Sequence, residues 1–257
     1  MMFQIKSYLK FLLNSTNEHG IHSPFVFDLV TKCFYDRKNY PEYKILKRYK
    51  NSLLRNTMVI DVKDFGAGSK VFKSNKRQVC KIAKNAGINS NRAELLFRMI
   101  KYFNFPNMLE IGTSLGLATS ALSLGNPKAS ITTIEGCPET SGLAKKEFSK
   151  FHLDNIECVI IEFRKFLSGT HGKKYDLIYF DGNHTKEATL SYFKLLLPTV
   201  NNSSVWIFDD IHWSAEMEEV WNDIKKHPEV TVTIDTFQWG IVFFRKEQVK
   251  ENFIIRS

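Results

Sequence analysis

Residues 107–135 read NMLEIGTSLGLATSALSLGNPKASITTIE, and this pattern predicts a strand, a glycine turn, a helix and a second strand. Residues 108–111 form a short, mainly apolar run that ends at a glycine, as a buried strand does. Residues 115–124 are rich in leucine and alanine, as a helix is. Gly112 and Gly116 bracket the turn. Because glycine has no side chain, the backbone can bend sharply there and a ligand can approach the amide groups at the helix N-terminus.

The second strand ends in Glu135, which lies 23 positions after Gly112. In a nucleoside-binding fold an acid at this position holds ribose, because a carboxylate can accept two hydrogen bonds from a vicinal diol. A dinucleotide fingerprint would place further glycines where this chain has Ser114 and Leu117. Glu110, just before the turn, would repel a phosphate but suits a cation such as the ammonium of an amino acid. The pattern therefore favours a ribose ligand without a diphosphate.

This segment resembles motif I of the class I S-adenosylmethionine-dependent methyltransferases, in particular the Glu-x-Gly-Thr-x-x-Gly form of the catechol O-methyltransferase-like and caffeoyl-CoA-like families. The resemblance implies S-adenosylmethionine as cofactor, with its methionine part at the turn and its ribose at Glu135. It also implies an adenine contact at Glu162, although an acid after a strand is as often the first residue of a helix. The cofactor residues implied are Glu110, Gly112, Thr113, Ser114, Gly116, Glu135, Glu162 and Asp181.

The alternation of helices and strands continues after residue 135. We expect helices at 139–151, 163–168, 185–197 and 215–227, and strands at 156–161, 176–180 and 204–208. Two closing strands, 230–234 and 238–245, are too close in sequence for a parallel crossover and must form a hairpin. The predicted fold is a Rossmann-like, doubly wound α/β fold, with a mostly parallel seven-stranded sheet that ends in an antiparallel hairpin. A nicotinamide-dependent oxidoreductase would continue its crossovers, so the hairpin and the glycine spacing both weaken that alternative.

Three acids follow neighbouring predicted strands, where ligands of such sheets bind: Asp181, Asp209 and Asp210. Converging carboxylates repel one another unless they share a proton or a cation, and a divalent cation with oxygen ligands would meet that need. The catechol-type enzymes have Asp at the first position and Asp-Asn at the second, and these residues bind magnesium. The resemblance thus implies Mg²⁺ or another divalent cation at the three aspartates, and the Asp in place of Asn at 210 leaves its occupancy open.

The catalytic lysine of that family lies three residues after the first Asp, and here the position is His184. A histidine can act as a general base on a substrate hydroxyl near neutral pH, so we expect catalytic roles for His184 and Asp181. The alternative is that His184 orients Asp181 or caps the following helix.

The N-terminal third carries the positive charge of the chain. Residues 1–90 contain 17 Lys and Arg against 6 Asp and Glu, whereas residues 91–257 contain 19 against 21. We expect residues 1–90 to be a basic, mainly helical extension or lid without strands of its own, and residues 91–257 to be the methyltransferase domain. The predicted helices are 3–13, 25–34, 40–54, 78–86 and 91–103, the last with Asn91 as its N-cap and Glu94 completing a capping box.

Such a basic segment can attract nucleic acid, an anionic membrane surface or an acidic substrate. A solvated helical face is favoured, because the lysines are scattered and few aromatic residues lie between them. A second glycine motif, Asp64 to Ser69 with Gly66 and Gly68, has no acid 20 to 25 residues later and is interpreted as a loop. Whether this loop closes over a substrate or only connects two elements stays open.

We expect an enzyme that transfers a methyl group from S-adenosylmethionine to a hydroxyl oxygen of a small-molecule acceptor, with or without a metal. A nucleic-acid or protein N-methyltransferase is the main alternative, but the strand end at Asp181 lacks the Asn/Asp-Pro-Pro-aromatic motif of those enzymes. A non-catalytic binding module on the same fold is a further alternative. No apolar run approaches the length of a membrane span, and the four cysteines are far apart, so an unexported, cytoplasmic protein is predicted. A homodimer is compatible with the sequence, and nucleic acid as a partner is not favoured.

Overall fold

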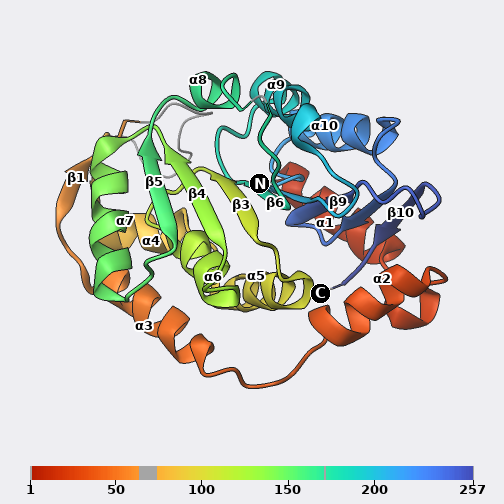
Figure 1. Ribbon diagram of the computed structural model, residues 1–257, viewed down its shortest axis with the longest axis horizontal. Helices are drawn as coiled ribbons and strands as arrows, with labels where there is room; N and C mark the ends of the chain where they lie inside the picture. Colours follow the sequence, from red (N-terminus) through yellow and green to blue (C-terminus); the bar gives the residue numbers. More distant parts are fainter. Residues whose placement is uncertain (1, 64–73, 171, 257) are drawn as a thin grey trace. The chain divides into compact units, whose positions relative to one another are not determined.

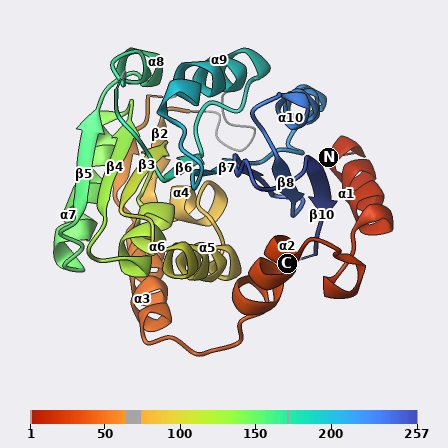
Figure 2. The same ribbon diagram turned by 45° about the vertical axis from the view of Figure 1, so that its right-hand side comes forward.

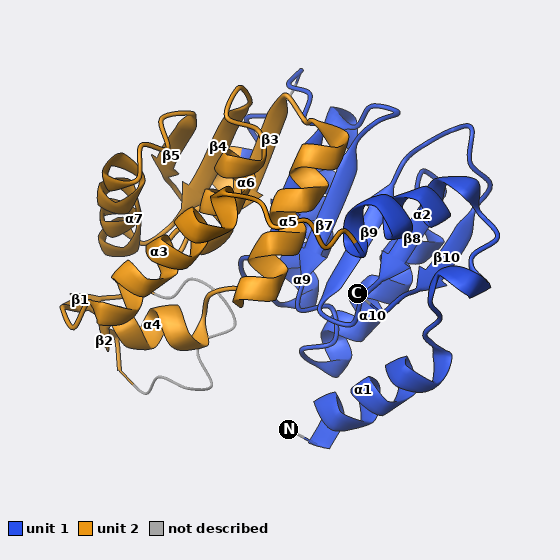
Figure 3. Ribbon diagram, turned by 90° about the horizontal axis from the view of Figure 1, so that it is seen from below, with its two compact units in different colours: residues 1–35, 167–257 blue, residues 36–166 orange. Residues whose placement is uncertain are grey.

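The computed structural model describes residues 2–63, 74–170 and 172–256, and it has a mixed α/β fold (Figure 1). The chain packs as two compact units, one of residues 36–166 and the other of residues 1–35 with 167–257 (Figure 3). The Gly66–Gly68 loop lies outside the described residues. The expected division of the chain at residue 90 stays a prediction, because packing units do not by themselves define domains.

The unit of residues 36–166 is built on three parallel strands, β3 Asn107–Ile111, β4 Ser130–Glu135 and β5 Ile156–Ile160. β4 lies between the other two, with Glu110 opposite Thr133 and Glu135 opposite Ile160. Parallel neighbours need a crossover, and α6 Leu117–Gly125 and α7 Pro138–Lys150 supply it. The predicted strand, turn, helix and strand of residues 107–135 are confirmed.

Three more described helices lie in this unit, α3 Glu42–Arg55, α4 Val79–Asn85 and α5 Ser90–Phe103, and α8 Phe163–Leu167 begins at its end. α5 packs on α6, and α3 packs on α4, α5 and α6 (Figure 3). The expected cap of α5 at Asn91, with Glu94, is wrong. Asn89 has extended backbone angles and its side chain accepts a hydrogen bond from the Arg92 amide, so the N-cap lies two residues earlier than expected.

The N-terminal third also contains strands, contrary to expectation. β1 Val59–Asp61 and β2 Lys76–Gln78 form an antiparallel pair. Each is only three residues long, and β2 consists of Lys, Arg and Gln, so neither shows the apolar alternation by which a strand is recognised in sequence.

The second unit contains β6 Leu177–Phe180 and β7 Val205–Asp209, which are parallel, and a hairpin of β8 Val232–Asp235 and β9 Trp239–Phe243. β9 runs antiparallel to β7, which confirms the closing hairpin. β10 Glu251–Ile254, paired in parallel with β8, is a described strand beyond the seven expected. The helices α9 Lys186–Leu196 and α10 Ala215–Lys226 match the predicted ones (Figures 1 and 2).

The N-terminal helices α1 Met2–Asn14 and α2 Pro24–Leu29 belong to the same unit, and α2 continues as a π-helix over Val30–Phe34. Ser23 caps α2 by accepting a hydrogen bond from the Val26 amide. The core of this unit is built around the fully buried rings of Trp206, Trp221 and Trp239. Within the described ranges, no helix combines the length and the hydropathy that crossing a membrane requires.

Candidate active site

The glycine turn between β3 and α6 has a left-handed backbone. Gly112 has φ 102°, Ser114 φ 48° and Gly116 φ 75°. A Cβ at Gly116 would lie 2.4 Å from the ring of Phe148 and 2.6 Å from the hydroxyl oxygen of Tyr49. Both the backbone angle and the lack of space therefore require glycine at 116.

Tyr49, on α3, holds this turn from outside. Its hydroxyl donates a hydrogen bond of 2.9 Å to the Leu115 carbonyl, and its ring packs on Phe148 and Phe151 at centroid distances of 6.2 and 5.1 Å. Burial, with smaller contributions from nearby acidic groups, raises the pKa of Tyr49 well above its ordinary value, so the hydroxyl stays a neutral donor. Sequence reasoning missed this residue because it lies 66 positions from its partner.

Glu135 lies at the end of β4, beside the turn. Its Oε2 accepts a hydrogen bond of 2.8 Å from the Ser114 amide, and its Oε1 accepts one of 2.9 Å from the Cys137 amide. The carboxylate is only half-buried, and each oxygen can accept a second hydrogen bond. The structure thus places a fixed acceptor next to the turn, as ribose binding requires.

Glu110 is fully buried at the end of β3. Its Oε2 accepts hydrogen bonds from the hydroxyls of Thr119 and Thr133, and Thr133 in turn lies 2.5 Å from the hydroxyl of Thr113. Oε1 is buried and has no hydrogen-bond partner among the described residues. Burial raises the pKa of Glu110 to about 7, against the lowering effect of the two threonine hydroxyls, and the charge of Glu135 adds to the increase. An unpartnered buried carboxylate oxygen is a suitable acceptor for a ligand ammonium.

Glu162 is exposed and accepts hydrogen bonds of 2.9 Å from the amides of Arg164 and Lys165. It thereby caps the N-terminus of α8, which is the alternative role considered for it. An adenine contact at Glu162 stays a prediction.

The remaining expected site residues belong to the other unit. Asp181 follows β6, and its Oδ1 lies 3.7 Å from Nε2 of His184, with about a fifth of each side chain exposed. Thr185, whose hydroxyl accepts a hydrogen bond from the Ala188 amide, caps α9. The helix cap is therefore not His184, and the pairing of His184 with Asp181 is what the structure shows.

Asp209, one of the three aspartates expected to bind a metal, accepts hydrogen bonds from two protein donors. Asp209 is 5% exposed, and its Oδ1 accepts a hydrogen bond of 2.8 Å from the Asp210 amide while its Oδ2 accepts one of 3.4 Å from the Tyr179 hydroxyl. In the part of the chain that the structure describes, no group of three or more His, Cys, Asp or Glu side chains is placed to hold a metal ion. The divalent cation expected at Asp181, Asp209 and Asp210 stays a prediction.

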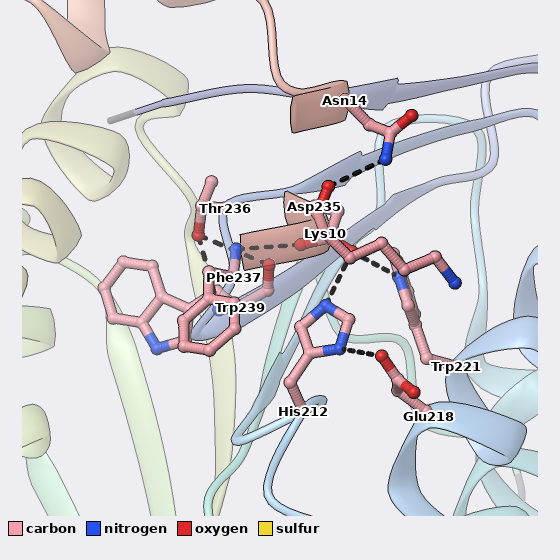
Figure 4. A network of polar contacts seen from close by, with 9 residues as sticks. All are labelled: Lys10, Asn14, His212, Glu218, Trp221, Asp235, Thr236, Phe237 and Trp239. Carbon is pink, nitrogen blue, oxygen red and sulfur yellow. Dashed lines mark hydrogen bonds and ion pairs between the residues drawn. The ribbon is translucent and has the colours of Figure 1, made fainter. Parts of the chain in front are cut away.

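A partly buried histidine that the sequence analysis did not single out, His212, lies just after β7 (Figure 4). Nδ1 of His212 is 2.8 Å from Oε1 of Glu218 on α10, and Nε2 is 2.9 Å from Oδ2 of Asp235 on β8. Trp221 also donates to Asp235, and the ring of Phe237 stacks on the imidazole at 5.2 Å. Burial would lower the pKa of His212, but the hydrogen bonds and charges of Asp235 and Glu218 outweigh it and raise the pKa. The imidazole ring of His212 thus ties the loop after β7 to α10 and to the hairpin.

The fold is similar to that of solved methyltransferases. A Podospora anserina methyltransferase solved with S-adenosylhomocysteine superposes with a TM-score of 0.61 at 13% identity, over 88% of this chain and 97% of the other. An O-methyltransferase of Bacillus cereus, also in complex with S-adenosylhomocysteine, superposes with a TM-score of 0.56 at 14% identity, over 83% and 95%. These likenesses establish the class of fold, that of the class I methyltransferases.

Sequence comparison agrees with that class. Residues 109–211 match the family model described as a methyltransferase domain. A curated tRNA1(Val) (adenine(37)-N6)-methyltransferase of a Flavobacteriaceae bacterium is 36% identical over 90 residues, which is 32% of this chain. The match spans 38% of the length of that relative. The resemblance to class I S-adenosylmethionine-dependent methyltransferases is confirmed.

Proposed function

We propose that the protein is an S-adenosylmethionine-dependent methyltransferase that methylates a hydroxyl oxygen of a small-molecule acceptor. The observation that carries the proposal is the carboxylate of Glu135, fixed beside the left-handed glycine turn by the Ser114 amide. The methyltransferase-domain match over residues 109–211 and the cofactor products bound in the similar structures support it.

The residues of the turn suit this cofactor. Glu135 would accept hydrogen bonds from the ribose hydroxyls, and the unpartnered Oε1 of Glu110 would accept one from the ammonium. Glycine at 116 allows the left-handed backbone of the turn to pack closely against Phe148 and Tyr49, which holds the turn in place. When bound, S-adenosylmethionine supplies an electrophilic methyl group on a sulfonium.

His184 and Asp181 form the group proposed to act on the acceptor. His184 would take the proton from the acceptor hydroxyl, and the carboxylate 3.7 Å away would favour the imidazolium that results. This proposal assigns the proton transfer to His184, and no step of it is routed through a metal. The rest of the rate enhancement would come from aligning the acceptor oxygen with the methyl group.

N-methylation of a nucleic acid is the second candidate. The name of the curated relative and the basic N-terminal third favour it. The chain has Asp-Gly-Asn-His at residues 181–184, which lacks the adjacent prolines and aromatic ring with which N-methyltransferases hold a planar amine. Oxygen methylation is therefore preferred.

Calorimetric titration with S-adenosylmethionine and, separately, with NAD tests the proposal. S-adenosylmethionine should bind and NAD should not. Glu135→Ala removes two hydrogen bonds to a charged group, at about 1.5 kcal/mol or more each, so its Kd should rise at least about a hundredfold. Glu139→Ala, an exposed acid on α7, is the matched control and should bind as the wild type does. Unchanged affinity in Glu135→Ala would refute the assignment.

A further inference from the structure

The helix α3 forms one wall of a pocket of about 720 Å³ in the unit of residues 36–166. This α3 pocket is defined by residues of the segment before α3, of α3 itself, of the segment between α4 and α5, of α5 and of the first turns of α6. Leu117 and Ser120 of α6 line it, whereas neither Glu110 nor Glu135 does. The α3 pocket is thus separate from the glycine turn, although α3 contributes residues to the pocket and also contacts the turn through Tyr49.

Five cationic side chains line the α3 pocket, and the acid among its described lining residues is Glu94. The five are Arg37, Lys38, Lys44, Lys47 and Lys50. On α3, lysines at positions 44, 47 and 50 follow the three-residue spacing that puts side chains on one face of a helix. Scattered lysines of the sequence are therefore gathered by the fold, and no described acid forms a salt bridge with these five.

The interior of the pocket is apolar and one lysine reaches into it. Leu46, Ile88 and Leu117 are buried and line the pocket. Lys50 is half-buried, donates a hydrogen bond of 3.2 Å to the Ile88 carbonyl, and has its pKa lowered by burial. The other four cations, by contrast, are exposed: Arg37, Lys38, Lys44 and Lys47. A ligand suited to this pocket has an apolar or aromatic body and several negative charges at one end.

We propose that the α3 pocket binds a small organic molecule that carries two or more phosphate groups. Its volume is that of a small-molecule site, and several phosphates would neutralise the excess of cations around it. The lack of a free aromatic ring among the described lining residues argues against a single-stranded nucleic acid as the ligand. Tyr43 is the aromatic residue among the described lining, and its ring is already packed against Tyr40 and Phe97 while its hydroxyl accepts from Arg98. Strand binding relies on free aromatic faces, which this pocket does not offer.

The test uses GTP as the probe and the full-length protein, with binding followed by calorimetry. GTP has a triphosphate and a purine body, and it lacks the adenine of the proposed cofactor, so binding at the turn is avoided. Tripolyphosphate tests the phosphate part of GTP alone, and guanosine tests the nucleoside part alone. A 12-nucleotide single-stranded RNA tests whether the phosphates of a nucleic acid bind instead. GTP should bind more tightly than each of these three, and its affinity should fall as salt is raised.

Lys44→Gln with Lys47→Gln should weaken GTP binding roughly tenfold or more, because two charged hydrogen-bond donors are lost. The matched control is Lys145→Gln with Lys146→Gln, two exposed lysines of α7 that do not line the pocket. Leu54→Glu is a second variant, since Leu54 is 37% exposed at the pocket and an added acid there should repel phosphate without disturbing the core.

Equal GTP binding by the α3 and α7 double variants would overturn the proposal, as would the absence of saturable GTP binding. Tighter binding of the RNA than of GTP, sensitive to the same lysines, would also overturn it and would assign α3 to nucleic acid. The melting temperature of each variant shows that the fold is intact. None of these readouts depends on methyl transfer, so failure of the proposed function leaves the test valid.

Discussion

Replacing the buried Glu110 by glutamine should make the stability of the protein less dependent on pH. The carboxyl has a pKa of about 7 in the folded protein and an ordinary value of 4.5, because burial penalises its charged form. The folded protein therefore holds this proton more tightly than the unfolded chain does. Between these two pH values the unfolded chain binds fewer protons, so stability falls as pH rises.

The size of the effect follows from the difference in pKa. A shift from 4.5 to about 7 corresponds to about 3 kcal/mol of lost stability once Glu110 is fully ionised, at about 1.4 kcal/mol per pH unit. About 2 kcal/mol of that loss falls between pH 5.5 and pH 8.5. Glutamine keeps the shape and can accept from Thr119 and Thr133, but it does not ionise.

Urea unfolding of the wild type and of Glu110→Gln at both pH values measures this directly. The change in unfolding free energy caused by the substitution should be about 2 kcal/mol more favourable at pH 8.5 than at pH 5.5. Glu157→Gln, an exposed carboxylate on β5, is the control and should show no such difference. An equal effect of Glu110→Gln at the two pH values would show that Glu110 is ionised in the folded protein throughout, and the reasoning would be wrong.

Three further predictions concern other residues of the two units. Gly116→Ala should lower stability by about 1–3 kcal/mol and weaken S-adenosylmethionine binding, because the left-handed backbone and the ring of Phe148 both oppose a Cβ; a wild-type melting curve would contradict this. The His184→Gln variant should have a kcat at least about a hundredfold lower, with an unchanged Kd for the cofactor. The activity of the wild type should persist in a chelator, and its loss there would support a metal ion at the three aspartates. The His212→Gln variant should lose most stability at low pH. Because the pKa of His212 is raised in the folded protein, the contribution of His212 to stability is complete below pH 6.5 and is lost as pH rises through the folded pKa. A loss of stability in the variant that instead grows with pH would contradict the raised pKa.

The part of the site that sequence could predict is the part made by neighbours in the chain. The turn from Glu110 to Gly116, and the acid at the end of the next strand, follow one another within a single strand-helix-strand unit. Parallel pairing of β3 and β4 then brings Glu135 to the Ser114 amide without any further requirement. The sequence pattern predicts the contact between Glu135 and the Ser114 amide because this contact needs only the parallel pairing of two consecutive strands.

The contacts that sequence could not predict join residues far apart in the chain. Tyr49 reaches the turn from a helix that shows only a basic, amphipathic pattern, and His212 meets Asp235 across 23 positions. The surroundings of Asp209 could not be predicted either. Its hydrogen bonds from the Asp210 amide and from the Tyr179 hydroxyl depend on how the strands pack, and the metal site that the sequence pattern suggested at the three aspartates stays a prediction.

The hydrogen bond from the Tyr49 hydroxyl to the Leu115 carbonyl limits where chimeras of this protein with its relatives can be joined. A crossover placed just before α5 would pair the glycine turn of one parent with the α3 of another. The recombined turn would then lose its donor unless the incoming helix also carried a tyrosine at the matching position, and Phe148 would face an unmatched neighbour. Exchange of residues 36–166 as one block keeps donor, acceptor and both rings from a single parent, so recombinants with these breakpoints should retain the turn where crossovers near residue 90 do not.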